Sequence, residues 1–131
     1  MIVDASAIVA ILLGEPGAER LVEAIAAAAR RTIGAPTVVE ASAVMLARKG
    51  PAGEVALDAL LARLDIETVA MSPAASNAAR SAYRRFGKGV GSPAVLNFGD
   101  CLAYGVAAAA DAPLLFTGDD FGRTDIRAAR S

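Results

Sequence analysis

Short apolar runs alternate along this chain with longer stretches that carry apolar residues at helical spacing. The runs lie at residues 1–3, 32–36, 66–70 and 114–117, and consecutive runs are separated by one or two helical stretches. Such an order predicts right-handed crossovers and a parallel sheet that is covered by helices on both faces. A chain of 131 residues is long enough for one such α/β domain, spanning 1–131, and too short for a second.

The helical stretches have clear start and stop signals. Gly50 and Pro51 end one of them, Ser72 with Pro73 begins another, and Asn97 caps the last. The stretches are expected at residues 8–13, 18–31, 37–48, 52–64, 73–86 and 98–110. The glycine-rich segment 87–92 is expected to be a mobile loop, and Ile126 is the candidate for a short fifth strand.

Histidine is absent from the chain, which restricts the chemistry that it can perform. The absence removes the commonest general base, the usual partner of a catalytic Ser or Cys, and the commonest zinc ligand. Cys101 is the single cysteine, so no internal disulfide can form, and its apolar neighbours favour a core position. Catalysis would depend on carboxylates, hydroxyls, arginines or a metal ion.

Neither a basic start followed by an apolar leader nor a bilayer-length apolar run is found in the sequence. The apolar run at residues 101–110, for example, is too short to span a membrane. We therefore expect a cytoplasmic protein without a membrane segment.

Four carboxylates follow or interrupt apolar segments, where solvated acids are not expected. They are Asp4 after Met1-Ile2-Val3, Glu40 after Val38-Val39, Asp100 beside Cys101-Leu102, and Asp119 after Leu114-Leu115-Phe116. Only Asp119 has an arginine or lysine close by in sequence, namely Arg123. An acid in an apolar setting is costly unless it is paired or bound to a cation, so the pattern indicates a divalent-metal site.

The predicted elements bring these four acids to one edge of the sheet. Asp4 and Asp119 follow strands, whereas Glu40 and Asp100 lie in the first turns of helices. The carboxyl ends of parallel strands and the helix starts that follow them share an edge, which is where sites form in open α/β sheets. Taken singly, Asp4 is also typical of a helix cap and Asp100 of a helix amino terminus. The coincidence of all four favours the metal site.

Carboxylates without histidine or cysteine favour Mg²⁺ or Mn²⁺ over zinc. Clustered carboxylates that hold one or two such ions are typical of enzymes that hydrolyse phosphodiesters with a metal-activated water. Ser6 is in a position either to hydrogen-bond a carboxylate, a metal-bound water or a phosphate, or simply to cap the helix that follows.

At these residues the chain resembles a known family. The segments Met-Ile-Val-Asp-Ala-Ser-Ala, Val-Val-Glu-Ala, Leu-Asn-Phe-Gly-Asp-Cys-Leu-Ala-Tyr and Leu-Leu-Phe-Thr-Gly-Asp-Asp-Phe are similar to the four signature blocks of the PIN domain. More narrowly, they resemble the VapC-type toxins of bacterial toxin–antitoxin pairs. The resemblance extends over essentially the whole chain and implies a three-layer α/β/α sandwich with a central parallel sheet of four to five strands.

The resemblance also implies a function. It implies a Mg²⁺- or Mn²⁺-dependent endoribonuclease that forms a homodimer, acts on tRNA or another structured RNA, and is neutralised by a cognate VapB-type antitoxin. Asp4, Glu40 and Asp100 match the first three acidic positions of the family. Asp119 is favoured for the fourth because it follows the strand more closely, and the adjacent Asp120 is the alternative.

One departure from the family pattern concerns the glycine-rich loop. Many members carry a histidine before the Pro-Ala that precedes the third acidic block, whereas Ser92 precedes Pro93-Ala94 here. The difference bears on the contacts of this loop with RNA and leaves the acidic residues unchanged.

The net charge is −1 and the sequence pI is about 5.4, so the protein as a whole is not basic. Any binding of RNA must therefore depend on a local cluster of basic residues. The densest basic group lies just before and within the glycine-rich loop: Arg80, Arg84, Arg85 and Lys88. Such a helix face is either an ordinary solvated surface or a phosphate-binding surface. Arg123 and Arg127, near Asp119 in sequence, are second candidates.

Two other functional classes are compatible with parts of the pattern. A phosphoaspartyl or receiver-like domain also places an Asp at a strand end, but it needs a lysine near the end of a late strand, and the chain has only Lys49 and Lys88. A P-loop is disfavoured because residues 87–92 lack its sequence. A non-catalytic interaction domain would retain the fold without turnover, although no acidic position has been lost.

Overall fold

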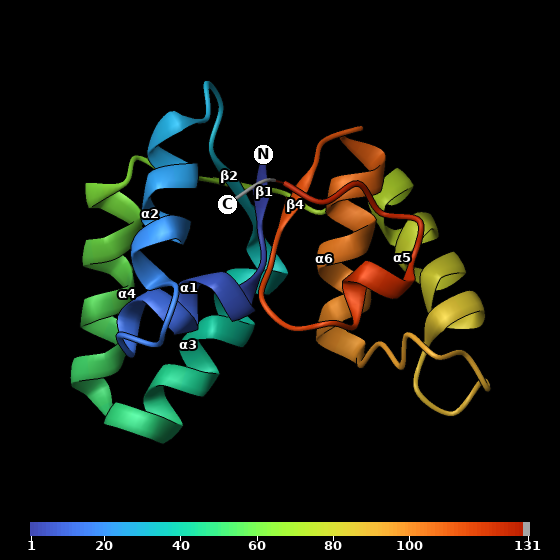
Figure 1. The fold of residues 1–131 in the computed structure, drawn as a ribbon, viewed down its shortest axis with the longest axis horizontal. Helices are drawn as coiled ribbons and strands as arrows, with labels where there is room; N and C mark the ends of the chain where they lie inside the picture. The colour runs from blue at the N-terminus through green and yellow to red at the C-terminus, as the bar shows by residue number, and fades with distance from the viewer. Residues whose placement is uncertain (130–131) are drawn as a thin grey trace.

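The computed structural model describes residues 1–129 and contains a parallel sheet of four short strands. The strands are β1 (Ile2–Val3), β2 (Thr32–Gly34), β3 (Glu67–Val69) and β4 (Leu114–Leu115). They lie in the order β3-β2-β1-β4, with β1 at the centre beside β2 and β4 (Figure 1). The last two residues of the predicted domain, 130 and 131, lie outside the described residues.

Six α-helices and one short 3₁₀ helix connect and cover the strands. The order of the elements is the predicted one, with two helices between each pair of consecutive strands. The helices are α1 (Ala5–Leu12), α2 (Ala18–Ala27), α3 (Ala35–Lys49), α4 (Pro51–Arg63), α5 (Pro73–Phe86), α6 (Phe98–Ala109) and the 3₁₀ helix η1 (Phe121–Arg123).

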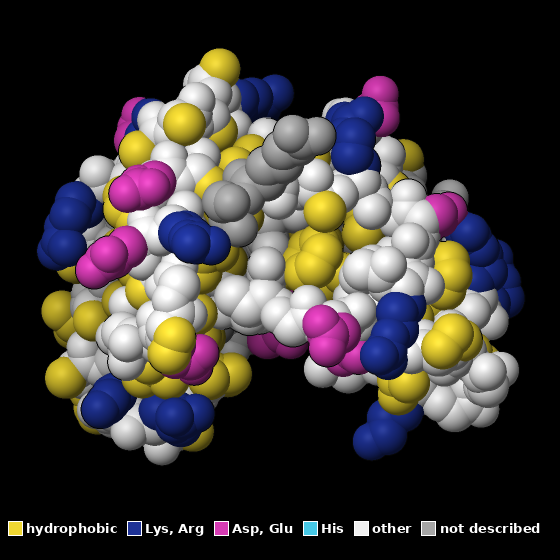
Figure 2. All heavy atoms as spheres, in the orientation of Figure 1, with side chains coloured by type: hydrophobic (Ala, Val, Ile, Leu, Met, Phe, Trp, Pro, Cys, Tyr) yellow, Lys and Arg dark blue, Asp and Glu magenta, His cyan; other side chains and the backbone are white. Residues whose placement is uncertain are grey.

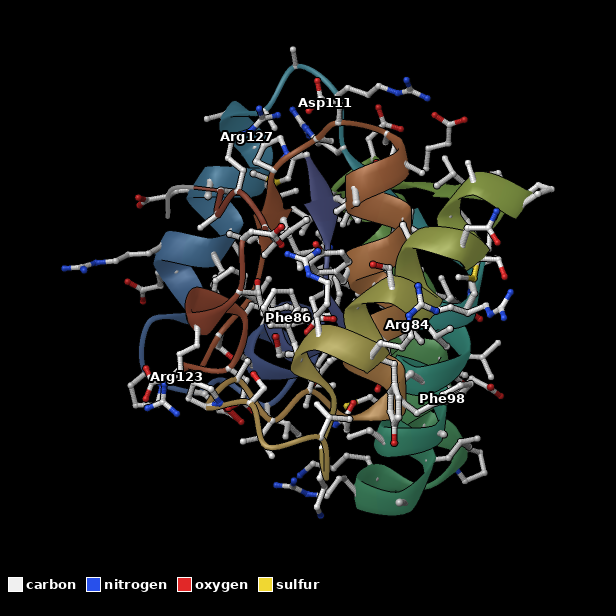
Figure 3. The ribbon with its side chains drawn as sticks, turned by 90° about the vertical axis from the view of Figure 1, so that its right-hand side faces the viewer. Arg84, Phe86, Phe98, Asp111, Arg123 and Arg127 are labelled. Atoms are coloured by element: carbon white, nitrogen blue, oxygen red, sulfur yellow. The ribbon has the colours of Figure 1, made fainter. Side chains whose placement is uncertain are left out.

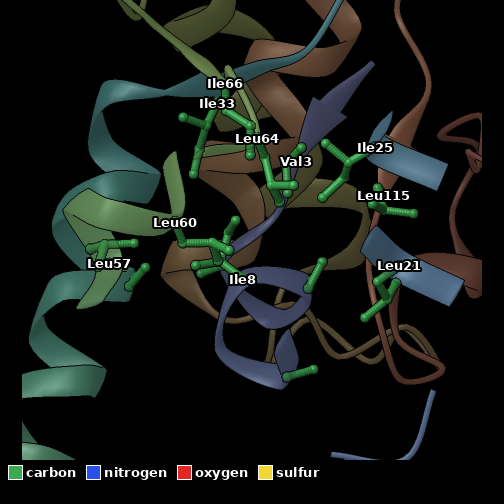
Figure 4. Packing of buried hydrophobic residues seen from close by; sticks show 14 residues of the cluster. Val3, Ile8, Leu21, Ile25, Ile33, Leu57, Leu60, Leu64, Ile66 and Leu115 are labelled. Carbon is green, nitrogen blue, oxygen red and sulfur yellow. The ribbon is translucent and has the colours of Figure 1, made fainter. Parts of the chain in front are cut away.

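Alternate residues of the central strands enter different cores, which creates three layers. Val3 and Leu115 join the cluster beneath α1, α2 and α4, whereas Ile2 and Leu114 join the cluster beneath α5 and α6 (Figures 1 and 4). This period of two is the geometry of a strand buried on both faces. The predicted α/β/α sandwich with a parallel sheet is confirmed.

Two element boundaries differ from the prediction for identifiable reasons. The helix expected at residues 18–31 ends at Ala27, because the Arg31 side chain turns back and donates hydrogen bonds to the carbonyls of Ala26 and Ala28, at 2.7 and 3.2 Å. Unsatisfied carbonyls at a helix end are often bound by such a side chain. The strand expected at residues 32–36 ends at Gly34, since Pro36 lies in the first turn of α3, where proline is tolerated.

The expected fifth strand near Ile126 is reduced to a single bridge. Leu114 pairs with Ala128 in parallel, and its amide donates to the carbonyl of Arg127 at 2.9 Å. Another boundary that differs is the start of α1, which begins at Ala5 rather than at residue 8. Within residues 1–129, none of the helices has the length and apolarity needed to cross a bilayer.

Candidate active site

The carboxyl edge of the sheet opens into a hollow between the two helical layers. In Figure 1 the strand β1 runs toward this edge, and Figure 2 shows the hollow on the same side of the molecule, with acidic side chains at its border. The turn between α3 and α4 forms one side of the hollow, and the loop after α5 forms the other. The fold therefore collects several predicted site residues at one edge.

Asp4 is the most deeply buried of the acids. It ends β1 and caps α1, and it is only 2% exposed. Its Oδ2 accepts a hydrogen bond from the Ser6 amide at 3.0 Å, but its buried Oδ1 has no hydrogen-bond partner among residues 1–129. Burial raises the pKa of Asp4, and hydrogen bonds from Ser6 partly offset this effect. The capping role and an unsatisfied carboxylate oxygen thus coexist in one residue.

Glu40 approaches the same place from the second turn of α3. The side chain lies so close to Gly99 at the start of α6 that a Cβ at that position would overlap the Glu40 carboxylate. Burial raises the pKa of Glu40 to about 7, with further contributions from the charges of Asp4 and Asp100. Glycine at position 99 therefore creates the space in which this carboxylate sits.

Asp100 lies in the first turn of α6 and also has a structural role. It forms a capping box with Asn97, whose side chain accepts from the Asp100 amide at 2.8 Å while the Asp100 carboxylate accepts from the Asn97 amide at 3.1 Å. Burial raises the pKa of Asp100 to about 6, against the lowering effect of the Asn97 hydrogen bond. The charges of Asp4 and Asp120 raise it further.

Both candidates for the fourth acidic position lie in the loop that follows β4. Gly118 adopts a positive φ of 83°, and both Asp119 and Asp120 are exposed. The carboxylate whose charge reaches Asp100 is that of Asp120. The spacing in the sequence favours Asp119, and the choice between the two residues stays a prediction.

Ser6 connects the first acidic segment to the last. Its amide donates to Asp4, and its hydroxyl accepts a hydrogen bond from the Thr117 amide at 3.0 Å. The serine thus fixes the end of β4 against the start of α1. Thr117 was not singled out in the sequence, and no local signal marks it.

The donor set fits a hard divalent cation. It consists of carboxylate oxygens, one of which is buried without a partner, and no Lys or Arg of residues 1–129 forms an ion pair with Asp4, Glu40 or Asp100. As the side chains lie, no three His, Cys, Asp or Glu residues in the described part of the chain are grouped closely enough to hold an ion. A shared ion would therefore require rotation of the exposed carboxylates toward Asp4.

Comparison with known proteins places this architecture in a family. The model of the PIN domain matches residues 1–127. The chain belongs to the PIN-domain family. Similar proteins include ribonuclease VapC42 of Mycobacterium tuberculosis, 45% identical over 129 residues that cover 98% of each chain. Ribonuclease VapC30 of the same organism is 44% identical over 126 residues, covering 96% of this chain and 95% of the relative.

A solved structure supports the fold independently of sequence. The crystal structure of Mycobacterium tuberculosis VapC20, described as a toxin that cleaves the sarcin–ricin loop, superposes with a TM-score of 0.78 at 14% identity. The match covers 99% of this chain and 98% of that one. At this identity the likeness concerns the fold alone.

Two of the predicted RNA-contacting residues of this PIN domain lie beside a groove. Arg80 and Arg84 line a cavity of about 570 Å³ between α5 and α6, together with Tyr83 and Phe98. Arg84 and Phe98 lie near each other in Figure 3. Lys88 is exposed in the loop after α5. These side chains are accessible, and their contact with RNA stays a prediction.

The other three arginines that were considered for RNA contact already have partners within the chain. Arg85 forms an ion pair with Asp125 at 2.7 Å, and Arg123 donates to the carbonyl of Pro93 at 3.1 Å. Arg127 donates to the carbonyl of Asp111 at 2.8 Å and lies at the opposite edge of the sheet from Arg123 (Figure 3). Although Arg127 is near Asp119 in sequence, it lies beside Asp111 in the fold, and its contact with RNA stays a prediction.

Proposed function

We propose that this PIN domain is the toxin of a toxin–antitoxin pair and cuts RNA by metal-dependent hydrolysis of phosphodiester bonds. The observation that carries the proposal is the buried Asp4 Oδ1, unpaired within residues 1–129, at an edge where Glu40 and Asp100 also have raised pKa values. Relatives that are 44–45% identical over nearly the whole chain are named VapC ribonucleases, which supports the same activity.

Each acidic residue has a distinct part in the proposed mechanism. Asp4, Asp100 and one of Asp119 and Asp120 would hold Mg²⁺ or Mn²⁺, with Asp120 the better placed of the last two. Glu40 would bind the ion or orient the attacking water through its carboxylate. Ser6 holds Asp4 in place through its amide. When bound, a divalent ion supplies activation of water and stabilisation of the leaving oxygen.

The partners of the toxin follow from the same proposal. We infer a VapB-type antitoxin that covers the acidic hollow and an RNA substrate, either tRNA or another structured RNA. An RNA target and the buried, free Cys101 favour a cytoplasmic location. Burial, with a smaller contribution from Asp100, raises the pKa of the Cys101 thiol to about 11, which makes it unreactive rather than catalytic.

We also infer that the toxin forms a homodimer through the apolar surface beside the groove. Phe98 and Val39 are 72% and 69% exposed, and Phe98 and Leu102 line both of the adjoining cavities on this face. Large contiguous apolar surfaces are characteristic of protein–protein contacts. Light scattering of the purified protein tests the proposal, because Val39→Glu should convert a dimer into a monomer, and an unchanged mass would contradict it.

The deciding experiment for the activity is cleavage of total cellular RNA by the purified full chain. Discrete products should form with Mg²⁺ or Mn²⁺, disappear with EDTA, and disappear in Asp100→Asn. Asp111→Asn is the matched control, because Asp111 is an exposed aspartate at the opposite edge of the sheet. An active Asp100→Asn protein would overturn the assignment. A protein that binds the antitoxin and never cleaves RNA would indicate an interaction domain instead.

A further inference from the structure

The loop that carries Asp119 and Asp120 is anchored at both ends by contacts that the proposed mechanism does not use. At its start, the Thr117 amide is bound by Ser6, and Phe121 is buried with its ring 5.1 Å from that of Phe116. These contacts fix where the loop leaves the sheet. These contacts do not by themselves determine how far the loop lies from α6, the helix that carries Asp100.

Asp125 provides a second anchor, on the far side of η1. Its Oδ1 accepts a hydrogen bond from the Tyr104 hydroxyl at 2.5 Å, and its Oδ2 accepts one from the Arg85 guanidinium at 2.7 Å. The hydrogen bonds from Tyr104 and Arg85 lower the pKa of Asp125. Tyr104 is a buried residue, and its ring packs near Phe86. Both oxygens of the Asp125 carboxylate therefore accept hydrogen bonds, one from α5 and one from α6.

The position of Tyr104 makes this contact informative. Tyr104 lies four residues after Asp100 on α6, so the two side chains project from the same face of the helix, about 6 Å apart along its axis. Through its hydrogen bond to Asp125, the Tyr104 hydroxyl thus attaches the loop to the same helix that carries Asp100.

Local hydrogen bonds also stabilise the turn between Asp120 and Ile126, the segment that contains Asp125. The Ile126 amide donates to the Thr124 hydroxyl at 3.2 Å, and that hydroxyl donates to the Phe121 carbonyl at 2.7 Å. The Arg123 amide then donates to the Asp120 carbonyl at 3.2 Å. Between Asp120 and Asp125 the backbone has little freedom to move independently.

We propose that Tyr104 and Asp125 are positioning residues that hold the backbone segment carrying Asp120 close to α6, so that the Asp120 carboxylate can turn to share one divalent cation with Asp100. The proposal rests on the proposed metal-dependent function. Partners in the outer shell of a metal site orient the ligands, and their loss weakens metal binding. Neither residue needs to touch RNA or the ion.

Calorimetric titration of the full chain with Mn²⁺ tests the proposal without reference to activity. Tyr104→Phe removes the hydroxyl and retains the ring, and it should lower the Mn²⁺ affinity by roughly tenfold. Asp125→Ala removes both acceptors and should lower it further. Asp111→Asn is the matched control, because Asp111 is also paired with an arginine of the C-terminal segment, Arg127, and should leave the affinity unchanged.

A double-mutant cycle separates positioning from a general loss of structure. If Tyr104 acts through Asp120, Tyr104→Phe should cause no further loss of Mn²⁺ affinity in an Asp120→Asn background. Equal losses in both backgrounds, or no loss in the wild-type background, would overturn the proposal.

A further measurement distinguishes this proposal from the proposed function itself. Backbone ¹⁵N relaxation of residues 118–123 reports loop mobility without metal, and Tyr104→Phe should increase this mobility. If the wild-type chain binds no Mn²⁺, the metal-dependent function fails, while the relaxation data still decide whether Tyr104 holds the loop. Unchanged relaxation in Tyr104→Phe would contradict the positioning role.

Discussion

The two edges of the sheet handle charge in opposite ways. At the amino edge, polar donors find acceptors within the chain. Arg31 donates to three carbonyls, including that of Leu64 at 3.0 Å, the Met1 amine donates to the Arg30 carbonyl at 3.1 Å, and the Thr32 hydroxyl donates to the Met1 carbonyl at 2.8 Å. This edge is internally satisfied, as buried and half-buried polar groups in native proteins usually are.

At the carboxyl edge, acids gather without compensating cations. Asp4 buries an oxygen that has no partner within residues 1–129, and burial together with the charge of Asp4 raises the pKa values of both Glu40 and Asp100. Burial and like charge are the arrangement that is characteristic of functional sites. The contrast between the edges indicates that the carboxyl edge is built for a ligand that the chain itself does not supply.

Removal of the buried acid should have the largest effect on activity. We expect Asp4→Asn to reduce RNA cleavage by more than about 100-fold, because loss of a direct ligand exceeds the 10- to 100-fold typical of outer-shell residues. The melting temperature of the metal-free protein should not fall, since an uncompensated buried charge is removed while the amide oxygen can still accept from Ser6. Loss of activity with an unfolded protein would contradict this reading of the carboxyl edge.

A methyl group beside Glu40 should have the next largest effect. Gly99→Ala would place a Cβ on the Glu40 carboxylate and displace it, so we expect cleavage to fall by roughly tenfold. Gly122→Ala is the matched control, because its Cβ would meet no atom within 4 Å. Comparable rates for the two variants would show that the position of Glu40 is unimportant. The measurement is initial cleavage rate at saturating metal.

The amino edge should respond in stability and not in activity. Arg31→Gln should lower the free energy of unfolding by about 1–3 kcal/mol, because three carbonyls lose a charged donor. Arg30→Gln is the control, since its side chain is 75% exposed and its guanidinium lies 4.0 Å from the Glu67 carboxylate. Urea unfolding measures both variants. If folded Arg31→Gln lost cleavage activity, this would contradict the view that the amino edge contributes to stability and not to activity.

The smallest predicted effect is a pH dependence of the metal-free protein. The folded-state pKa values of Glu40 and Asp100, about 7 and about 6, exceed their ordinary values of 4.5 and 3.8. The folded state therefore binds more protons than the unfolded state between about pH 4 and 7, and stability should decrease as the pH rises through that window. We expect the melting temperature in EDTA to fall across this window.

Two variations sharpen the pH experiment. Glu40→Gln should flatten the decrease, because the residue with the higher pKa no longer titrates. Saturating Mg²⁺ should reverse it, since the cation binds the ionised carboxylates and stabilises the folded state at high pH. A melting temperature that rises with pH in EDTA would contradict the assigned electrostatics.

Much of the fold could be predicted from the sequence because the local signals agree with one another. The order of strands and helices was correct, and Ser72, Pro73 and Asn97 begin α5 and α6 as expected. The boundaries that were wrong depend on contacts over distance. The end of α2 depends on where the Arg31 side chain reaches, and the fifth strand depends on how Ala128 meets Leu114.

The candidate site shows the same division. Asp4, Glu40 and Asp100 could be proposed from the sequence because an acid within an apolar segment stands out there without any knowledge of the fold. The choice between Asp119 and Asp120 stays a prediction, because adjacent loop residues differ only in where the folded loop directs them. The place of Arg127 beside Asp111 also depends on the path of the folded chain, which nearness to Asp119 in sequence does not reveal.

The sequence by itself determined the class of fold, its order of elements and the acidic character of the site, since these follow from apolar periodicity, capping residues and the absence of histidine. Only the tertiary structure decided that Gly99 makes room for Glu40, that Asp120 acts on Asp100, and that Asp125 is held by Tyr104 and Arg85. The reason is physical. Periodicity and capping are local properties of the chain, whereas burial, electrostatic coupling and side-chain pairing depend on distances that exist only after the helices have packed on the sheet.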